Sequence, residues 1–436
     1  WFAQKRTKRE AATAKMLPAS SVMRLAVLIT TWLLITATQG LRHEIASMSQ
    51  PRIGVAGTSV GNKALFGGGM LWIGGTRDST RVVDIYDAPS DSWSVAQLSA
   101  ARFFITAATV GNKGLFAGGY LGDYMVFSPA VDIYDSISGV WSVAKLSEPR
   151  VAMTAVVVGR KVLFGGGRRT VTQSTSTVDI YDSVSGTFST AQLSQPRRLM
   201  AGATLGTKAF FAGGLVEPGF SPDFVSDVVD IYDSESNSWS TARLSQPRHS
   251  IAAATVGSQV LFAGGTNGSA SDTVDIYDSN SGHWSTARLT SPRCAIAAVA
   301  LNGKALFAGG LSWESSSDPE SDAVDMYDPA TGAWTYTRLS SARSSLGAVT
   351  VGGKVLFGGG LGKAGVDIYD SSSESWSVTD LSQRSMETLS LYGLAVGDKA
   401  AFFGGYYYTG VPIPVFGRVD ILAFDEPPAP LTSENE

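Results

Sequence analysis

The sequence predicts an all-β protein built as an eight-bladed β-propeller, a closed ring of four-stranded antiparallel sheets. Its 436 residues include 48 glycines, 10 tryptophans and 14 tyrosines but only 17% charged residues. This bias is typical of many short strands joined by tight turns. A unit of about 47 residues also recurs along the chain, and each copy contains short β-branched and aromatic runs bounded by glycine or Asp-Ser turns.

An arginine opens each unit of the repeat. In the unit that begins at Arg248, one strand-like run follows the arginine and a second ends at a Gly-Gly doublet. The third run is Val-Asp-Ile-Tyr-Asp, and the fourth begins near a tryptophan. Runs this short, repeated at this period, indicate propeller blades with four strands each rather than an array of helices.

The Gly-Gly doublet, followed by tyrosine and then tryptophan at these spacings, resembles the kelch repeat. Eight doublets, from Gly68-Gly69 to Gly404-Gly405, carry the resemblance, which covers residues 42–425. Glycine at this place lets the second strand end in a conformation closed to other residues and lets neighbouring backbone approach. The resemblance implies a kelch-type propeller that acts as an interaction module.

The two ends of the repeat region predict how the ring closes. The eighth unit stops after Asp425 without a tryptophan strand, whereas residues 45–52 match the end of a unit at residues 241–248. We therefore expect an N-terminal outer strand to join three C-terminal strands. Closure of this kind removes exposed sheet edges.

The domain organisation follows from the segments outside the repeats. Residues 1–22 are basic and are predicted to be an unstructured leader or translated upstream sequence. Residues 23–40 contain Arg24, an apolar run over residues 25–35 and a small-residue end, the pattern of a secretory signal peptide. The run is shorter than the roughly 20 residues of a membrane span, so we expect no span after cleavage. Residues 41–425 are predicted to form a single propeller domain, secreted, extracellular or at the cell surface, and residues 426–436 a disordered tail.

The net charge and the cysteine content exclude one class of partner and one kind of covalent link. Residues 1–40 carry six basic residues and one acidic residue, so residues 41–436 hold 28 basic and 37 acidic residues, a net charge of −9. Nucleic acid is therefore not an expected partner. The single cysteine, Cys294, excludes an internal disulfide. Asn267-Gly268-Ser269 is a sequon in a predicted loop, which makes Asn267 the expected glycosylation site.

Comparison of the units with one another predicts two unlike faces of the disc. The turns after the first and third strands are nearly the same in every unit, whereas the loops after the second strand differ in length and carry aromatic side chains. The face that carries these loops and the connections between blades is called the variable face. Exposed aromatic loop residues favour recognition, and the residue after each arginine is expected to ring the channel mouth. The candidate ligand-binding residues are Trp72, Phe103, Tyr120, Tyr124, Arg198, Phe220, His249, Trp313 and Tyr407.

Each unit also pairs its arginine with an aspartate that opens the third strand. Alternating strand direction brings the two residues to the same face, so we predict charge-assisted Arg-Asp pairs that confer register more than net stability. An eightfold set is interpreted as structural rather than as an anion-binding ring. The arginines are Arg52, Arg102, Arg150, Arg197, Arg248, Arg293, Arg343 and Arg384, and the aspartates are Asp84, Asp132, Asp179, Asp230, Asp275, Asp325, Asp367 and Asp420.

Catalysis is not expected. Fungal galactose oxidase has a copper site on a kelch propeller, with two histidines, two tyrosines and a cross-linked cysteine. This chain has three histidines, of which only His249 falls on the variable face, so no metal or other cofactor is predicted. A propeller glycosidase of the sialidase type is a remote alternative, because sites of that type combine arginine, acidic and tyrosine side chains, and this chain carries Arg198, Glu387 and Tyr406–Tyr408. No nucleophile triad or phosphate-binding loop is found.

The function that remains is binding of a protein or glycan at the variable face. The alternative is an extracellular structural subunit that self-assembles into an oligomer, a filament or a matrix.

Overall fold

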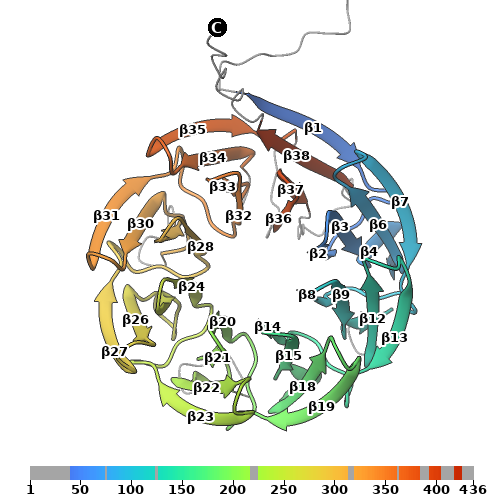
Figure 1. The fold of residues 1–436 in the computed structure, drawn as a ribbon, viewed down its shortest axis with the longest axis horizontal. Coiled ribbons are helices and arrows are strands. Elements are labelled where there is room, and N and C mark those ends of the chain that lie inside the picture. The colour runs from blue at the N-terminus through green and yellow to red at the C-terminus, as the bar shows by residue number, and fades with distance from the viewer. Residues whose placement is uncertain are drawn as a thin grey trace, which may run out of the picture. The chain divides into compact units, whose positions relative to one another are not determined.

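A computed structural model describes residues 40–73, 76–122, 126–216, 224–312, 319–360, 363–382, 392–403 and 417–424. In this part of the chain, eight four-stranded antiparallel sheets are arranged as the blades of a ring (Figure 1). The eight-bladed propeller predicted from the sequence is confirmed. The leader, the signal peptide and the tail predicted from the sequence lie outside the described residues.

Each blade has an inner, a second, a third and an outer strand, counted from the ring axis outward. Blades 1 to 7 follow chain order, and blade 8 combines strands from both ends of the repeat region. The inner strands are β2 (Ala56–Val60), β8 (Thr106–Val110), β14 (Thr154–Val158), β20 (Ala201–Leu205), β24 (Ala252–Val256), β28 (Ala297–Leu301), β32 (Gly347–Val351) and β36 (Tyr392–Val396). The second strands are β3 (Lys63–Gly67), β9 (Lys113–Ala117), β15 (Lys161–Gly165), β21 (Lys208–Ala212), β25 (Gln259–Ala263), β29 (Lys304–Ala308), β33 (Lys354–Gly358) and β37 (Lys399–Phe403).

The outer half of each blade is the hairpin that carries the Asp-Ile-Tyr-Asp motif and the tryptophan. The third strands are β6 (Val82–Asp87), β12 (Ala130–Asp135), β18 (Thr177–Asp182), β22 (Val228–Asp233), β26 (Thr273–Asp278), β30 (Ala323–Asp328), β34 (Gly365–Asp370) and β38 (Arg418–Phe424). The outer strands are β7 (Ser92–Gln97), β13 (Trp141–Lys145), β19 (Thr187–Gln192), β23 (Ser238–Arg243), β27 (His283–Arg288), β31 (Ala333–Arg338), β35 (Ser375–Asp380) and β1 (Leu41–Ser47).

The variable-face loops of blades 1 to 3 contain short hairpins, where the sequence pattern predicts loops without strands. They are β4 (Met70–Ile73) with β5 (Thr76–Ser79), β10 (Tyr120–Leu121) with β11 (Val126–Phe127), and β16 (Arg168–Thr170) with β17 (Gln173–Ser174). No helix among the described residues is long and apolar enough to span a membrane.

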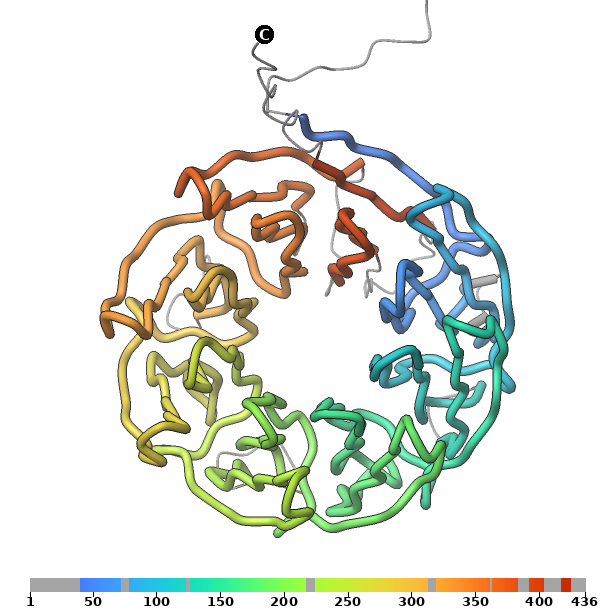
Figure 2. Tube along the Cα trace, viewed as in Figure 1, coloured from blue at the N-terminus to red at the C-terminus, as the bar shows by residue number. Residues whose placement is uncertain are grey.

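The ring closes as the sequence predicts. Strand β1 pairs antiparallel with β38 over its whole length, from Leu41 opposite Phe424 to Ser47 opposite Arg418. The chain trace therefore completes one turn, and the two ends of the repeat region meet in blade 8 (Figure 2).

The core is divided into clusters that lie between neighbouring blades. At the seam between blades 8 and 1, Phe66 packs edge-on against Phe403 with ring centroids 4.7 Å apart, and Tyr86 packs against Trp93 at 5.1 Å. Equivalent clusters join the other neighbours around the ring, so each blade contributes to two of them. Burial of apolar side chains between blades therefore supplies the hydrophobic stabilisation that each flat sheet lacks alone.

A polar network also crosses the closing seam. The Lys399 ammonium group of blade 8 lies 2.9 Å from the Asp91 carboxylate of blade 1 and donates a hydrogen bond to the Tyr86 hydroxyl. Burial and the bond to Asp91 raise the pKa of Tyr86 to about 12, and Lys399 opposes that shift.

This network predicts an alkaline limit to stability. In the unfolded chain Tyr86 loses its proton near its ordinary pKa of about 10, whereas the folded protein retains that proton until about pH 12. Stability should therefore be unchanged below about pH 10 and fall as the pH rises from about 10 to about 12. Thermal melting followed by tryptophan fluorescence across this range is the measurement. Tyr86→Phe should flatten the fall, and an equally steep fall in that variant would contradict the assignment.

Candidate functional site

Seven of the eight predicted Arg-Asp pairs are ion pairs in the structure. The seven arginines are 0% exposed and the aspartates almost as buried. The pairs are Arg52-Asp84, Arg102-Asp132, Arg150-Asp179, Arg197-Asp230, Arg248-Asp275, Arg293-Asp325 and Arg343-Asp367. Arg384 lies outside the described residues, and Asp420 accepts hydrogen bonds from His43 Nε2 and from the Ser382 amide, each at 2.7 Å.

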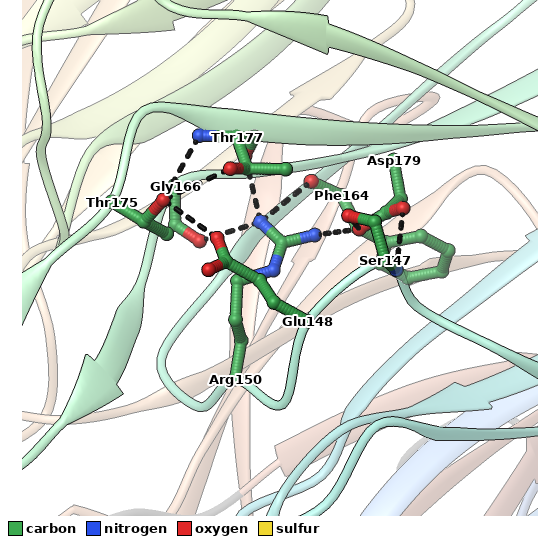
Figure 3. Close-up of polar contacts among 8 residues, drawn as sticks. All are labelled: Ser147, Glu148, Arg150, Phe164, Gly166, Thr175, Thr177 and Asp179. Carbon is green, nitrogen blue, oxygen red and sulfur yellow. Dashed lines mark hydrogen bonds and ion pairs between the residues drawn. The ribbon is translucent and has the colours of Figure 1, made fainter.

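Arg150 shows the contacts that six of the seven arginines share (Figure 3), whereas Arg52 donates to the carbonyl oxygens of Gly68, Phe66 and Gln50. Its guanidinium donates to the carbonyl oxygens of Gly166 at 2.8 Å and Thr177 at 2.7 Å, and it pairs with Asp179. Burial lowers the pKa of Arg150, and the Asp179 and Glu148 carboxylates oppose that shift. The guanidinium thus ties the connection between blades to the second and third strands of blade 3.

The backbone of the same arginine reaches the preceding blade. The Arg150 carbonyl oxygen accepts a hydrogen bond of 3.0 Å from the Gly119 amide of blade 2. Gly118 has a φ of 69°, and a Cβ atom there would overlap the Arg150 carbonyl oxygen. The arginine and the Gly-Gly doublet therefore act together to link two blades. Glycine is required in the doublet because its φ is positive and because the arginine backbone approaches it closely.

The residue that follows each arginine is expected to ring the channel mouth, and one of these residues, Val151, lines the pocket described below. Its backbone forms a bridge to the residue after the Gly-Gly doublet, as between Phe103 and Tyr120. Phe103 is 1% exposed and Arg198 is 4% exposed. These two candidate ligand-binding residues are buried and support the surface instead of forming it.

The residue two positions after each arginine has a distinctive backbone. It has a left-handed backbone in each blade that the structure describes there, with φ between 50° and 63°. These residues are Gly54, Phe104, Ala152, Leu199, Ser250, Ala295 and Ser345. The sequence signal that could have found them is Gly54, since glycine in one unit often marks a position with positive φ.

A pocket of about 680 Å³ lies beside the inner strands of the ring, and four of these residues, Gly54, Phe104, Ala152 and Leu199, line it. Phe104, Leu199 and Tyr392 expose 41%, 41% and 51% of their surface there, and Ile105 and Val151 complete its apolar wall. We call it the axial pocket. Its volume is typical of sites for small molecules or single side chains.

Tyr120 lines the axial pocket and belongs to an aromatic group in blade 2. Its ring stacks on Phe103 at 5.3 Å and lies edge-on to Phe104 at 6.2 Å and to Phe127 at 5.1 Å. Burial raises the pKa of Tyr120, and the positive charges of Arg168 and Arg198 oppose that shift. The hydroxyl is therefore a neutral donor at neutral pH.

Of the remaining candidates, His249 is half-buried on the variable face. Burial and the nearby Arg198 lower the pKa of His249, which keeps the imidazole neutral at neutral pH. The backbone of Trp72 lies in β4. Tyr124, Phe220, Trp313 and Tyr407 lie outside the described residues, as do Glu387 and Tyr406–Tyr408 of the glycosidase alternative. The described residues contain no group of three or more His, Cys, Asp or Glu side chains suited to a metal ion.

Comparison with known proteins finds a matching family model and similar solved structures. Residues 104–310 match the family model of the KLHDC2/KLHL20/DRC7 Kelch-repeats domain. This part of the chain is similar to kelch-repeat domains, and the fold is an eight-bladed β-propeller. A kelch propeller suggests a protein-interaction module. The solved "Structure of YjhT" is similar to this kelch propeller, with 15% sequence identity, a TM-score of 0.46 and coverage of 67% of this chain and 99% of that one. No curated protein matches the sequence.

Proposed function

We propose that the chain is a secreted interaction module that holds an apolar group of a partner protein or glycan in the axial pocket. The observation that carries this proposal is the exposed apolar lining of the axial pocket, where Phe104, Leu199 and Tyr392 expose 41%, 41% and 51% of their surface. Exposed apolar surface gathered in one pocket is typical of a binding site.

The lining of the axial pocket suits an apolar or aromatic group. Phe104, Tyr120 and Tyr392 supply aromatic surface, the residue class that dominates binding energy in interfaces. A partner side chain or a sugar ring is therefore the kind of group that we expect here.

Secretion and glycosylation are part of the same proposal. Secretion rests on the signal-like pattern of residues 23–40. Asn267 lies in a variable-face turn between Thr266 and Ala270, which form a β-bridge. A sequon in an exposed turn of this kind is accessible to a glycan.

The binding proposal predicts the effect of changes in the axial pocket. Peptide and glycan arrays probed with the labelled full chain should give ligands whose binding is at least about tenfold weaker for Phe104→Ser or Leu199→Ser, because each removes a buried apolar contact worth about 1.5–3 kcal/mol. Fluorescence polarisation with the best array ligands measures the change.

Val184→Ser is the matched control for these variants. Val184 is 74% exposed in the turn between β18 and β19, on the face opposite the axial pocket, and its replacement should leave binding unchanged. Ligands that respond equally to all three variants, or arrays without any ligand, would argue against the axial pocket.

A further inference from the structure

Gly54 is a glycine that its backbone does not require. It stands two positions after the unit-opening arginine of blade 1, with a φ of 63°. Six residues at the equivalent place of other blades carry side chains at φ values between 50° and 56°, so this backbone accommodates residues from alanine to phenylalanine. They are Phe104, Ala152, Leu199, Ser250, Ala295 and Ser345. The missing side chain at Gly54 therefore needs another reason.

The space beside Gly54 supplies that reason. A Cβ atom there would lie 3.9 Å from Phe104 Cε1, an ordinary van der Waals distance, and among the described residues only the Phe104 ring comes within 4 Å. Gly57 lines the same pocket but differs, because a Cβ atom there would overlap the ring of Phe403. Packing between blades thus explains Gly57, whereas Gly54 leaves room in the axial pocket.

Large side chains surround this room on one side of the ring only. In ring order, Gly54 of blade 1 stands between Tyr392 of blade 8 and Phe104 of blade 2, and all three line the axial pocket. The equivalent residues of blades 5 to 7 are small and do not belong to the lining. An aromatic residue therefore flanks the glycine on each side.

The lining also favours an uncharged side chain over a sugar. None of the described lining residues is charged, and the polar side chains among them are Thr106, Tyr120 and Tyr392. A sugar ring carries several hydroxyl groups, and each one that is buried without a partner lowers the affinity. An aromatic side chain such as that of phenylalanine has no such requirement and buries a large apolar area.

We propose that Gly54 sets the size of the group that the axial pocket accepts, and that this group is a large uncharged side chain, such as phenylalanine or tryptophan, of a protein partner. The inference rests on the proposed function, since it concerns the same pocket. Gly54 is then a specificity-determining residue, because a side chain at this position would occupy the space that the partner uses.

Filling the space at Gly54 tests the proposal. A peptide that the full chain binds on the array is synthesised with alanine, leucine, phenylalanine or tryptophan at each apolar position in turn, and its affinity is measured by fluorescence polarisation. At one position the unchanged chain should bind the phenylalanine or tryptophan peptide at least about tenfold more tightly than the alanine peptide. Gly54→Leu should remove most of this preference, because its side chain takes the place of the ring.

Ala295→Leu is the matched control for Gly54→Leu. Ala295 has the equivalent place in blade 6, with a φ of 51°, and it does not line the axial pocket, so this variant should keep both affinity and preference. Thermal melting shows whether the two leucine variants keep the fold, which we expect because Leu199 has the same backbone. If Gly54→Leu does not fold, Gly54→Ala decides, and it should weaken binding of the tryptophan peptide about threefold.

A preference for large side chains that survives in the Gly54 variants, while Phe104→Ser weakens binding, would overturn this inference and leave the proposed function standing. Oligosaccharides that bind where no peptide does, and that respond to Phe104→Ser, would have the same consequence. Ligands that are indifferent to both Phe104→Ser and Leu199→Ser would overturn the proposed function together with this inference.

Discussion

Arg248→Met should lower the free energy of unfolding by about 3–5 kcal/mol, one of the largest effects available in this chain. The substitution keeps much of the side-chain volume but leaves Asp275, which is 2% exposed, without its counterion. The carbonyl oxygens of Gly264 and Thr273 also lose their donor. Urea unfolding followed by tryptophan fluorescence gives the change in stability.

Blade 5 offers a matched control for this prediction. Arg288 pairs with Asp272 at 2.8 Å, but its side chain is 75% exposed, so Arg288→Met should cost less than about 1 kcal/mol. The double variant Arg248→Met/Asp275→Leu should recover most of the loss, since an apolar pair can replace a buried ion pair. Equal effects of Arg248→Met and Arg288→Met would contradict the assigned role of the buried pair.

Gly118→Ala should destabilise the protein by between about 2 and 5 kcal/mol, the sum of left-handed strain and steric overlap. Gly118 has a φ of 69°, and its new methyl group would overlap the carbonyl oxygen of Arg150 in the connection to blade 3. The connection would have to move, and with it the guanidinium that holds Asp179.

Gly111→Ala separates the two contributions. Gly111, in the same blade, also has positive φ, at 55°, but nothing lies within 4 Å of the Cβ position. It should cost only the backbone term, about 1–2 kcal/mol. If both alanine variants lose the same stability in thermal and urea unfolding, then close approach between blades is not what requires glycine at position 118.

These two predictions concern the same link between neighbouring blades. The arginine side chain binds the blade that it opens, and its carbonyl oxygen binds the Gly-Gly doublet of the blade before it. Because buried ion pairs add little net stability but exclude other arrangements, we expect the seven pairs to set the register of neighbouring blades. The hydrophobic clusters between blades provide the larger share of stability.

Much of the fold can be predicted from the sequence because each repeat unit carries local patterns that specify strands and turns. Runs such as Val-Asp-Ile-Tyr-Asp have the period and composition of half-buried strands, and the Gly-Gly doublets require a backbone that only glycine adopts freely. The match between residues 45–52 and residues 241–248 places the missing strand of blade 8 without any coordinates. Eight unit-opening arginines, separated by seven steps that average about 47 residues, then leave a closed ring as the consistent arrangement.

The arginine and aspartate partners also follow from the sequence, because the strand order alone brings them to the same end of a blade. The complete burial of these residues does not follow from the sequence, since burial depends on how the blades pack together. The short hairpins of blades 1 to 3 were missed for a related reason. Their pairing is between a few residues in loops of irregular length, where no period is long enough to detect.

By itself, then, the sequence determined the number of blades, the four strands of each blade, the closing strand and the Arg-Asp pairs, because all of these repeat and depend on local patterns. Only the tertiary structure decided which residue faces the ring axis. In blade 2 the first residue after the arginine, Phe103, is buried and Phe104 lines the axial pocket, whereas in blade 3 Val151 and Ala152 both line it. A shift of one residue in an extended segment exchanges its buried and exposed sides, and no composition rule reports it.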